Sequence, residues 1–326
     1  MTDTLHLSAP PNHLAPDELR VRPGVDGVSV SIDPERAAWR YLAFRTLPLR
    51  VGERVAVGGS GSETAVVVVA GGGLIVEPDA GATLKLEGRQ TVFHARPWAA
   101  YLPSGLLAHL SPMPVDEGGQ VLVALAEAPS SGRHEVASAP ILIRPRDVKV
   151  EIRGAGNATR RIHHIIAPDF PADRLELVEV YTPGGNWSSW PPHKHDVDAM
   201  PNEAVLEEIY YYQQRRPEGW GLQRLYRREG DRRDALWAVR HGELVLVTDG
   251  YHPFVAAHGY DAYYLNALAG DRRTMACTDD PVLAWTRDAW ADMRPTRARL
   301  PWWLRTRSEC AAPRQAEFSG FVPLAA

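Results

Sequence analysis

The stretch Asn186-Trp-Ser-Ser-Trp-Pro-Pro-His193-Lys-His195-Asp196 is the part of the sequence that decides how the fold is interpreted. Its two histidines are separated by one residue, so on a β-strand both imidazole rings point to the same face. Paired imidazoles of this kind are typical metal ligands. The stretch therefore predicts a strand that contributes two ligands to one site.

Two later stretches can complete that site. Glu207-Glu208-Ile-Tyr-Tyr-Tyr212 begins twelve residues after His195, and Gly250-Tyr-His252-Pro253 follows it. Neighbours on a strand face opposite ways, so either Glu207 or Glu208 joins the histidines, and His252 adds a third imidazole. Three neutral imidazoles and one carboxylate suit a divalent first-row metal and leave positions open for substrate oxygens.

The sequence around this region alternates apolar and polar residues over short segments, as half-buried strands do. Clear examples are Val148-Lys-Val-Glu-Ile152, Leu175-Glu-Leu-Val-Glu-Val180, Glu243-Leu-Val-Leu-Val247 and Tyr263-Tyr-Leu-Asn-Ala267. The chain also contains 27 glycines and 27 prolines, which break it into short pieces, and helical periodicity is sparse. These features predict an all-β protein.

The two halves of the chain follow the same order of strands and turns, which indicates an internal repeat. In the first half a strand at 64–69 precedes the turn Pro103-Ser-Gly105 and a strand at 119–125. In the second half a strand at 208–212 precedes the turn Asp249-Gly250 and a strand at 261–267. We therefore expect two small β-barrels, an N-terminal one over 1–150 and a C-terminal one over 151–285, followed by a tail over 286–326.

Composition favours a soluble protein with a small-molecule partner. The net charge is −4 and no Lys/Arg run would follow a nucleic-acid backbone. The N-terminus lacks the features of a signal peptide, and no apolar segment is long enough to span a membrane. With two cysteines, Cys277 and Cys310, a disulfide framework is not expected, so we predict a cytoplasmic location. Barrel edge strands often pair between subunits, which predicts a homo-oligomer.

The His-x-His, the downstream Glu and the glycine turn with a His together resemble the cupin superfamily of antiparallel β-barrels. The long spacer before Glu208 and the short Gly-x-His resemble, more narrowly, the bacterial 5-deoxy-glucuronate isomerases of myo-inositol catabolism. These are relatives of the 4-deoxy-threo-hexulose-uronate isomerase family. The resemblance is nearly full length and also rests on Ile152–Arg160, Gln223–Tyr226 and Tyr260–Gly270. It implies a double cupin, with two barrel or jelly-roll domains.

By the same resemblance the metal ligands are His193, His195, Glu208 and His252, because in the related family the ligand Glu precedes a Val/Ile-Tyr pair. The implied reaction is the aldose–ketose isomerisation of 5-deoxy-D-glucuronate to 5-dehydro-2-deoxy-D-gluconate through a metal-stabilised enediol. The metal expected is zinc, with iron or manganese as alternatives. No organic cofactor is expected.

Residues for proton transfer and substrate binding follow from their positions. Tyr210 and Tyr212 share the face of Glu208 and are candidate proton shuttles, although such rings are also ordinary core residues. For the substrate carboxylate the candidates are Lys194 and Arg224, together with Arg160, and Tyr251 is a candidate for the pocket wall.

The first half departs from the metal-site pattern. Ala108 occupies the position of the histidine in its turn motif, and no His-x-His precedes it. His94 and His109 are isolated, so we expect the N-terminal barrel to be free of metal. Two other functions remain open at this level, a metal-dependent cupin dioxygenase and a non-enzymatic sugar-binding double cupin.

Overall fold

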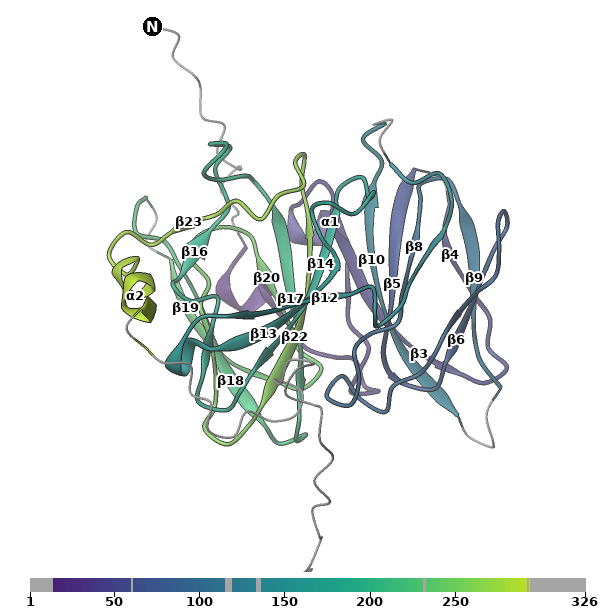
Figure 1. The fold of residues 1–326 in the computed structure, drawn as a ribbon, viewed down its shortest axis with the longest axis horizontal. Helices are drawn as coiled ribbons and strands as arrows, with labels where there is room; N and C mark the ends of the chain where they lie inside the picture. The colour runs from purple at the N-terminus through teal and green to yellow at the C-terminus, as the bar shows by residue number, and fades with distance from the viewer. Residues whose placement is uncertain are drawn as a thin grey trace, which may run out of the picture.

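Strands dominate the computed structural model, which describes residues 14–59, 61–114, 119–132, 136–230, 233–291 and 293. Figure 1 shows two β-rich halves side by side, with the N-terminal strands in blue on the right and the later ones in green on the left. Strands lie at or within about a residue of all four segments in which the sequence alternates most clearly. None of the helices in the described ranges has the length and apolar character needed to span a membrane.

The first half contains one 3₁₀ helix, one short α-helix and strands β1 to β11. Their bounds are η1 Pro16–Glu18, β1 Arg20–Val21, β2 Ser31–Ile32, α1 Pro34–Ala37, β3 Ala43–Arg50, β4 Val55–Gly58, β5 Ser62–Gly71, β6 Leu74–Pro78, β7 Leu84–Leu86, β8 Ala99–Leu102, β9 Leu107–Pro112, β10 Gln120–Pro129 and β11 Ile141–Ile143.

The second half contains strands β12 to β23 and three short helices. Their bounds are β12 Lys149–Arg153, η2 Gly156–Ala158, β13 Arg160–Ile166, β14 Leu175–Thr182, β15 Trp187–Ser188, β16 His193–Lys194, β17 Glu207–Gln214, β18 Trp220–Tyr226, β19 Asp234–Arg240, β20 Leu244–Val247, β21 Phe254–Ala256, β22 Ala262–Ala269, β23 Thr278–Asp279, α2 Trp285–Asp288 and η3 Ala289–Ala291.

Each half pairs a large antiparallel sheet with a smaller one, as expected for a double cupin. In the first half the orders are β11-β8-β5-β10-β3-β2 and β4-β9-β6-β7. In the second half they are β1-β20-β17-β22-β14-β13-β12 and β15-β21-β18-β19, with β16-β23 as a separate pair. The fold is thus all-β and built from an internal repeat.

The expectation of barrels needs one correction, because the described strands form open sheets rather than closed hydrogen-bonded cylinders. In each half the two sheets pack through side chains, as in a jelly roll. In the first half, Val66 and Leu125 of the large sheet share one buried cluster with Val76 and Leu110 of the small sheet. In the second half the ring of Tyr212 lies 5.1 Å from that of Phe254 on the facing sheet.

The two halves are joined by more than the chain that links them. The expected boundary at residue 150 falls within β12, which belongs to the large sheet of the second half. The N-terminal strand β1 also leaves its own half, because Arg20 and Val21 pair with Val245 and Leu244 of β20. A continuous buried core runs through both halves. The large sheet of the second half, which carries Glu208, is therefore supported on both of its faces.

Candidate metal centre

Three buried side chains from separate parts of the second half meet at one point. His195 follows β16, Glu208 lies on β17, and His252 lies in the turn between β20 and β21. Glu208 Oε2 lies 2.9 Å from His195 Nε2 and 3.3 Å from His252 Nε2. The nearest ligand atoms of all three residues lie within 4.8 Å of one another. This arrangement has the size and composition of a metal site.

His193 joins this group from the edge of the cavity. Its strand β16 pairs with β23, where His193 lies opposite Asp279. The centroid of its ring is 4.7 Å from that of His252 and 6.5 Å from that of His195. The structure thus brings together all four residues that the sequence suggested as ligands.

Backbone carbonyl groups fix the orientation of the three imidazole rings. Nδ1 of His193 faces Pro191 O at 3.3 Å, Nδ1 of His195 faces Leu206 O at 2.9 Å, and Nδ1 of His252 faces Gly250 O at 3.0 Å. A carbonyl oxygen only accepts hydrogen bonds, so each Nδ1 carries the proton. In the neutral rings of His193 and His252, Nε2 is then left with its lone pair, as metal-ligating histidines are arranged, whereas Nε2 of His195 is hydrogen-bonded to Glu208 Oε2.

The protonation states also suit a cation. Burial lowers the pKa of both His193 and His252 to about 3, so these rings are neutral at physiological pH. His252 is fully buried, and its Nε2 makes no hydrogen bond of normal geometry to the described residues. At His195 burial also disfavours the charged form, but the hydrogen bond and negative charge of Glu208 outweigh it and raise the pKa. An unpartnered buried Nε2 beside a carboxylate indicates that a cation belongs here.

Glu207, the rival carboxylate, faces the other way. Its Oε1 accepts a hydrogen bond from the backbone N–H of Arg40 at 2.6 Å. Its Oε2 accepts from the N–H groups of Tyr41 at 2.9 Å and Leu42 at 2.8 Å. Glu207 therefore holds a segment of the first half, while Glu208 points into the second.

A cavity of about 80 Å³ adjoins the histidines. Its walls are formed by Arg153, Arg160, Trp190, His193, His195, Leu206, Glu208, Leu268, Met275, Ala276, Cys277 and Arg287. Cys277 is not one of the three residues whose ligand atoms meet, and burial raises the pKa of its thiol to about 11. The cavity thus combines three of the four candidate ligands with apolar walls and three guanidinium groups.

The three arginines of the cavity differ in their partners. Arg153 makes two hydrogen bonds with Glu151, at 2.7 and 2.9 Å, and Arg287 is held in the same way by Asp279. Arg160 is 4% exposed and donates to Ala158 O at 3.0 Å. Among the described residues no carboxylate pairs with Arg160. Burial lowers its pKa to about 10, which leaves it charged at neutral pH.

Of the residues suggested for substrate binding, Arg160 lines this cavity, whereas Lys194, Arg224 and Tyr251 do not. Lys194 points away from its histidine neighbours and pairs with Asp196 at 2.6 Å and Glu203 at 2.7 Å. Arg224 makes two hydrogen bonds of 2.7 Å with Asp234 on the next strand, in an exposed position. Tyr251 is 7% exposed and packs on another ring, that of Tyr226, at 5.3 Å.

The two candidate shuttle tyrosines lie deeper in the same half. Tyr210 and Tyr212 share the inward face of β17 with Glu208 and are fully buried. The hydroxyl of Tyr210 lies 2.6 Å from Ser189 Oγ, and that of Tyr212 donates to Gln223 Oε1 at 2.5 Å. Burial raises the pKa of both far above 10. Both are consequently poor proton acceptors at neutral pH.

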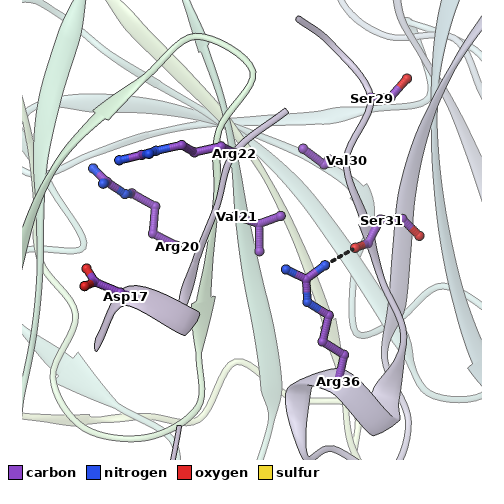
Figure 2. Close-up of a pocket in the computed structure, with 8 residues that line it drawn as sticks. All are labelled: Asp17, Arg20, Val21, Arg22, Ser29, Val30, Ser31 and Arg36. Atoms are coloured by element: carbon purple, nitrogen blue, oxygen red, sulfur yellow. Dashed lines mark hydrogen bonds between the residues drawn. The ribbon is translucent and has the colours of Figure 1, made fainter. Parts of the chain in front are cut away.

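A second hollow, of about 630 Å³, lies beside the N-terminal segment (Figure 2). It is lined by Asp17, Arg20, Val21, Arg22, Ser29, Val30, Ser31 and Arg36. There is no histidine among the described residues that line it, and Arg36 donates to the backbone oxygen of Ser31 at 3.4 Å. These described residues therefore do not offer the ligand set of the smaller cavity.

Comparisons with known proteins give matches over most of the chain. The model of the KduI/IolB family matches residues 16–286. A 5-deoxy-glucuronate isomerase of Geobacillus kaustophilus is 38% identical over 275 residues, which are 82% of this chain and 93% of that protein. An IolB-like protein of Salmonella typhimurium has a crystal structure that superposes with a TM-score of 0.75 at 34% identity, covering 82% of this chain and 98% of that one.

A more distant structure bears on the fold alone. An oxalate decarboxylase of Lactobacillus farciminis superposes with a TM-score of 0.54 at 10% identity and covers 86% of this chain and 89% of its own. The family assignment rests on the family model, which matches most of the sequence, and on the relative that is 38% identical over 82% of the chain. The chain belongs to the KduI/IolB family.

Proposed function

We propose that this protein is a 5-deoxy-glucuronate isomerase, an intramolecular oxidoreductase that converts the aldose 5-deoxy-D-glucuronate to the ketose 5-dehydro-2-deoxy-D-gluconate in myo-inositol degradation. The observation that carries the proposal is the buried group of His195, Glu208 and His252, opening on a cavity, in a chain of this family. Relatives that align with most of the chain are named for this activity.

The chain's own donors fit a divalent metal. His193, His195, Glu208 and His252 would hold it, and we propose zinc, with iron and manganese as alternatives. When bound, such an ion acts as a Lewis acid that polarises a carbonyl and makes the adjacent C–H bond acidic. The reaction moves hydrogen within one molecule, so it requires no organic cofactor.

Arg160 is proposed to bind the substrate carboxylate. A buried guanidinium without a carboxylate partner is costly, and an anionic ligand would compensate its charge. Arg160 lines the same cavity as His193 and Glu208. A planar guanidinium can also bind a carboxylate through two parallel hydrogen bonds, which orients the sugar acid.

The remaining cavity walls limit access of water to the reacting carbons. Leu206 and Leu268 provide apolar surface next to the histidines, and the indole of Trp190 is fixed by a hydrogen bond from Nε1 to Thr286 Oγ1 at 3.1 Å. An apolar wall strengthens electrostatic interactions at the site, because it lowers the local dielectric constant. A cytoplasmic location and a homo-oligomer remain predictions from the sequence.

The alternatives are a dioxygenase and a sugar-binding protein without activity. Both are compatible with three histidines and one glutamate, but the names of the relatives favour neither. A dioxygenase would consume oxygen, and a binding protein would leave the sugar unchanged. Both therefore differ from an isomerase in what is measured.

The direct test is a proton NMR time course of 5-deoxy-D-glucuronate with the purified protein. It is run on the protein as isolated, after chelation, and after single metals are returned. We expect the ketose to appear, chelation to stop it and zinc to restore it. Absence of turnover with every metal would eliminate the isomerase, and oxygen uptake with iron would favour the dioxygenase.

A further inference from the structure

The indole ring of Trp290 has no role in the site described so far, although it contacts two of the guanidinium groups of the cavity. Cζ of Arg160 lies over this ring at 5.7 Å from its centroid, and Cζ of Arg287 lies over it at 5.5 Å. A cation within about 6 Å of a ring centroid is attracted to the aromatic face. Both arginines line the cavity, whereas Trp290 is not among the lining residues. The ring therefore joins two cavity cations from outside the cavity.

Trp290 belongs to a short helical segment that is attached to the site at two points. The segment consists of α2 and the η3 turn that follows it directly, and α2 lies at the left edge of Figure 1. Thr286 Oγ1 accepts the hydrogen bond from Trp190 of the cavity wall at 3.1 Å. Arg287 makes hydrogen bonds of 2.7 to 2.9 Å with Asp279 of β23. These contacts fix the position of the segment relative to the cavity.

The guanidinium of Arg160 requires a contact that stabilises its charge. Burial is the main reason for its lowered pKa, and the charges of Arg153 and Arg287 lower that pKa further. Among the residues that the structure describes, no carboxylate pairs with Arg160, and an aromatic face supplies the compensating negative potential instead. An aromatic face also leaves N–H groups of the guanidinium free, whereas a carboxylate partner would occupy them. The contact with Trp290 therefore suits an arginine that binds a ligand.

We propose that Trp290 is a positioning residue for Arg160 and that the segment 285–291 belongs to the end of the site that recognises the substrate carboxylate. This assignment rests on the proposed isomerase function. The indole keeps the guanidinium of Arg160 at the cavity, and Arg287, which is anchored on Asp279, supports the indole. Arg287 and Trp290 follow residue 286, the last one that the family model matches, so the family assignment does not include them.

The test compares zinc-loaded wild type with Trp290→Leu and Trp290→Phe. Leucine removes the aromatic face and stays apolar, whereas phenylalanine keeps a weaker one. We expect KM for 5-deoxy-D-glucuronate to rise about 10-fold with leucine and about threefold or less with phenylalanine. The Kd of the acid obtained by reducing the substrate aldehyde to an alcohol, which cannot isomerise, should rise equally in calorimetry. The value of kcat, the zinc content and the melting temperature should stay close to wild type, because no metal ligand is changed.

A second comparison shows whether Trp290 acts through Arg160. In the Arg160→Gln background, Trp290→Leu should raise KM by no more than about twofold, because the guanidinium that the indole positions is already absent. A tryptophan that only stabilised the fold would raise KM by the same factor in both backgrounds. The matched control is Trp285→Leu in the same helix. Trp285 is 63% exposed, and no guanidinium of the described residues lies over its ring, so KM should be unchanged.

Three results would overturn the proposal. The first is a KM and a Kd of Trp290→Leu within about twofold of wild type, since loss of a buried cation–π contact has a larger effect. The second is an equal rise in KM in the Arg160→Gln background. The third is loss of zinc from Trp290→Leu, which would make the segment a support of the metal site. All three are distinct from a failure of the proposed function, in which the zinc-loaded wild type itself would not convert the sugar acid.

Discussion

The two halves of the molecule share one plan of sheets but fill it differently. The interior of the first half is a closed cluster of aliphatic side chains, among them Val66, Leu102, Ala108 and Leu125. The interior of the second half holds aromatic rings and the histidines, and it keeps a cavity. The sheets of this fold therefore do not depend on the metal ligands, because an aliphatic interior stabilises the same arrangement of sheets in the first half.

Two glutamates, Glu63 and Glu207, occupy equivalent positions in the two halves. Glu63 on β5 accepts hydrogen bonds from the backbone N–H groups of residues 173–175, at 2.6 to 2.7 Å, just as Glu207 accepts from residues 40–42. Each glutamate thus holds a segment of the opposite half. The next residue along each strand is buried, and it is Thr64 in the first half and Glu208 in the second. At this position the packed interior of the first half has a threonine, whereas the second half has a candidate metal ligand.

The largest effect is expected from a change that makes the second half resemble the first at the turn. His252→Ala places alanine where the first half has Ala108. We expect at least a 1,000-fold loss of turnover together with loss of bound zinc, because a buried ligand is removed. The measurements are the NMR assay and the metal content of the purified protein.

The matched control is His109→Ala, which removes the histidine next to Ala108 in the first half. It should keep both zinc and turnover. Zinc bound normally by His252→Ala would contradict the ligand assignment, and zinc lost from His109→Ala would show that the first half also binds metal.

A smaller effect is expected at Arg160, the buried cation in the cavity of the second half. The buried aliphatic cluster of the first half contains no such cation. Arg160→Gln should raise KM about 100-fold, which corresponds to about 3 kcal/mol for a buried charged pair. Arg224→Gln is the matched control, because Arg224 is already paired with Asp234 outside the cavity. Equal KM values for the two variants would contradict the role of Arg160.

Much of this site could be predicted from the sequence, because the two-residue period of a strand fixes which neighbours share a face. This period predicted that His193 and His195 share one face and that Glu207 and Glu208 face opposite ways. Periodicity could not distinguish Arg160 from Lys194 and Arg224. Lys194 and Arg224 are paired with Glu203 and Asp234, respectively. These ion pairs depend on how the turns and strands pack in the folded protein.

Two further features had no usable signal in the sequence. The segment 175–180 alternates like a half-buried strand, but every residue of β14 is buried, so the alternation does not show that Glu176 and Glu179 lie in the interior. Strand β1 consists of Arg20 and Val21 alone, too short for any period to predict that it joins β20. The burial of β14 and the pairing of β1 with β20 both depend on how the two halves pack against each other.

The contact between the halves should also respond to pH. Arg89 of the first half and Glu179 of β14 form a fully buried pair at 2.5 Å. Burial alone would raise the pKa of Glu179, but the charge of Arg89 and hydrogen bonds with His163 and Arg89 outweigh it and lower the pKa to about 2. As pH falls below the ordinary value near 4.5, the unfolded chain takes up a proton that the folded one does not, so stability declines between 4.5 and 2.

The expected loss over that range is about 3 kcal/mol in the free energy of unfolding. Denaturant unfolding of wild type and Glu179→Gln over this range provides the measurement. The variant should be the less stable at pH 7, and the difference should narrow as the pH falls. Parallel pH dependences would show that this pair does not control the acid stability of the contact.

The smallest effects are expected at the two glutamates that align the halves. Glu63→Gln and Glu207→Gln each remove a negative charge that accepts three backbone hydrogen bonds, so each should lower the free energy of unfolding by about 1 to 3 kcal/mol. Zinc content and turnover should remain, because both side chains face the opposite half. Glu77→Gln, which loses only a surface pair with Arg54, should change stability by less than about 0.5 kcal/mol. A large loss at Glu207 but none at Glu63 would mean that the two halves support each other unequally, with the metal-binding half depending on the packed one.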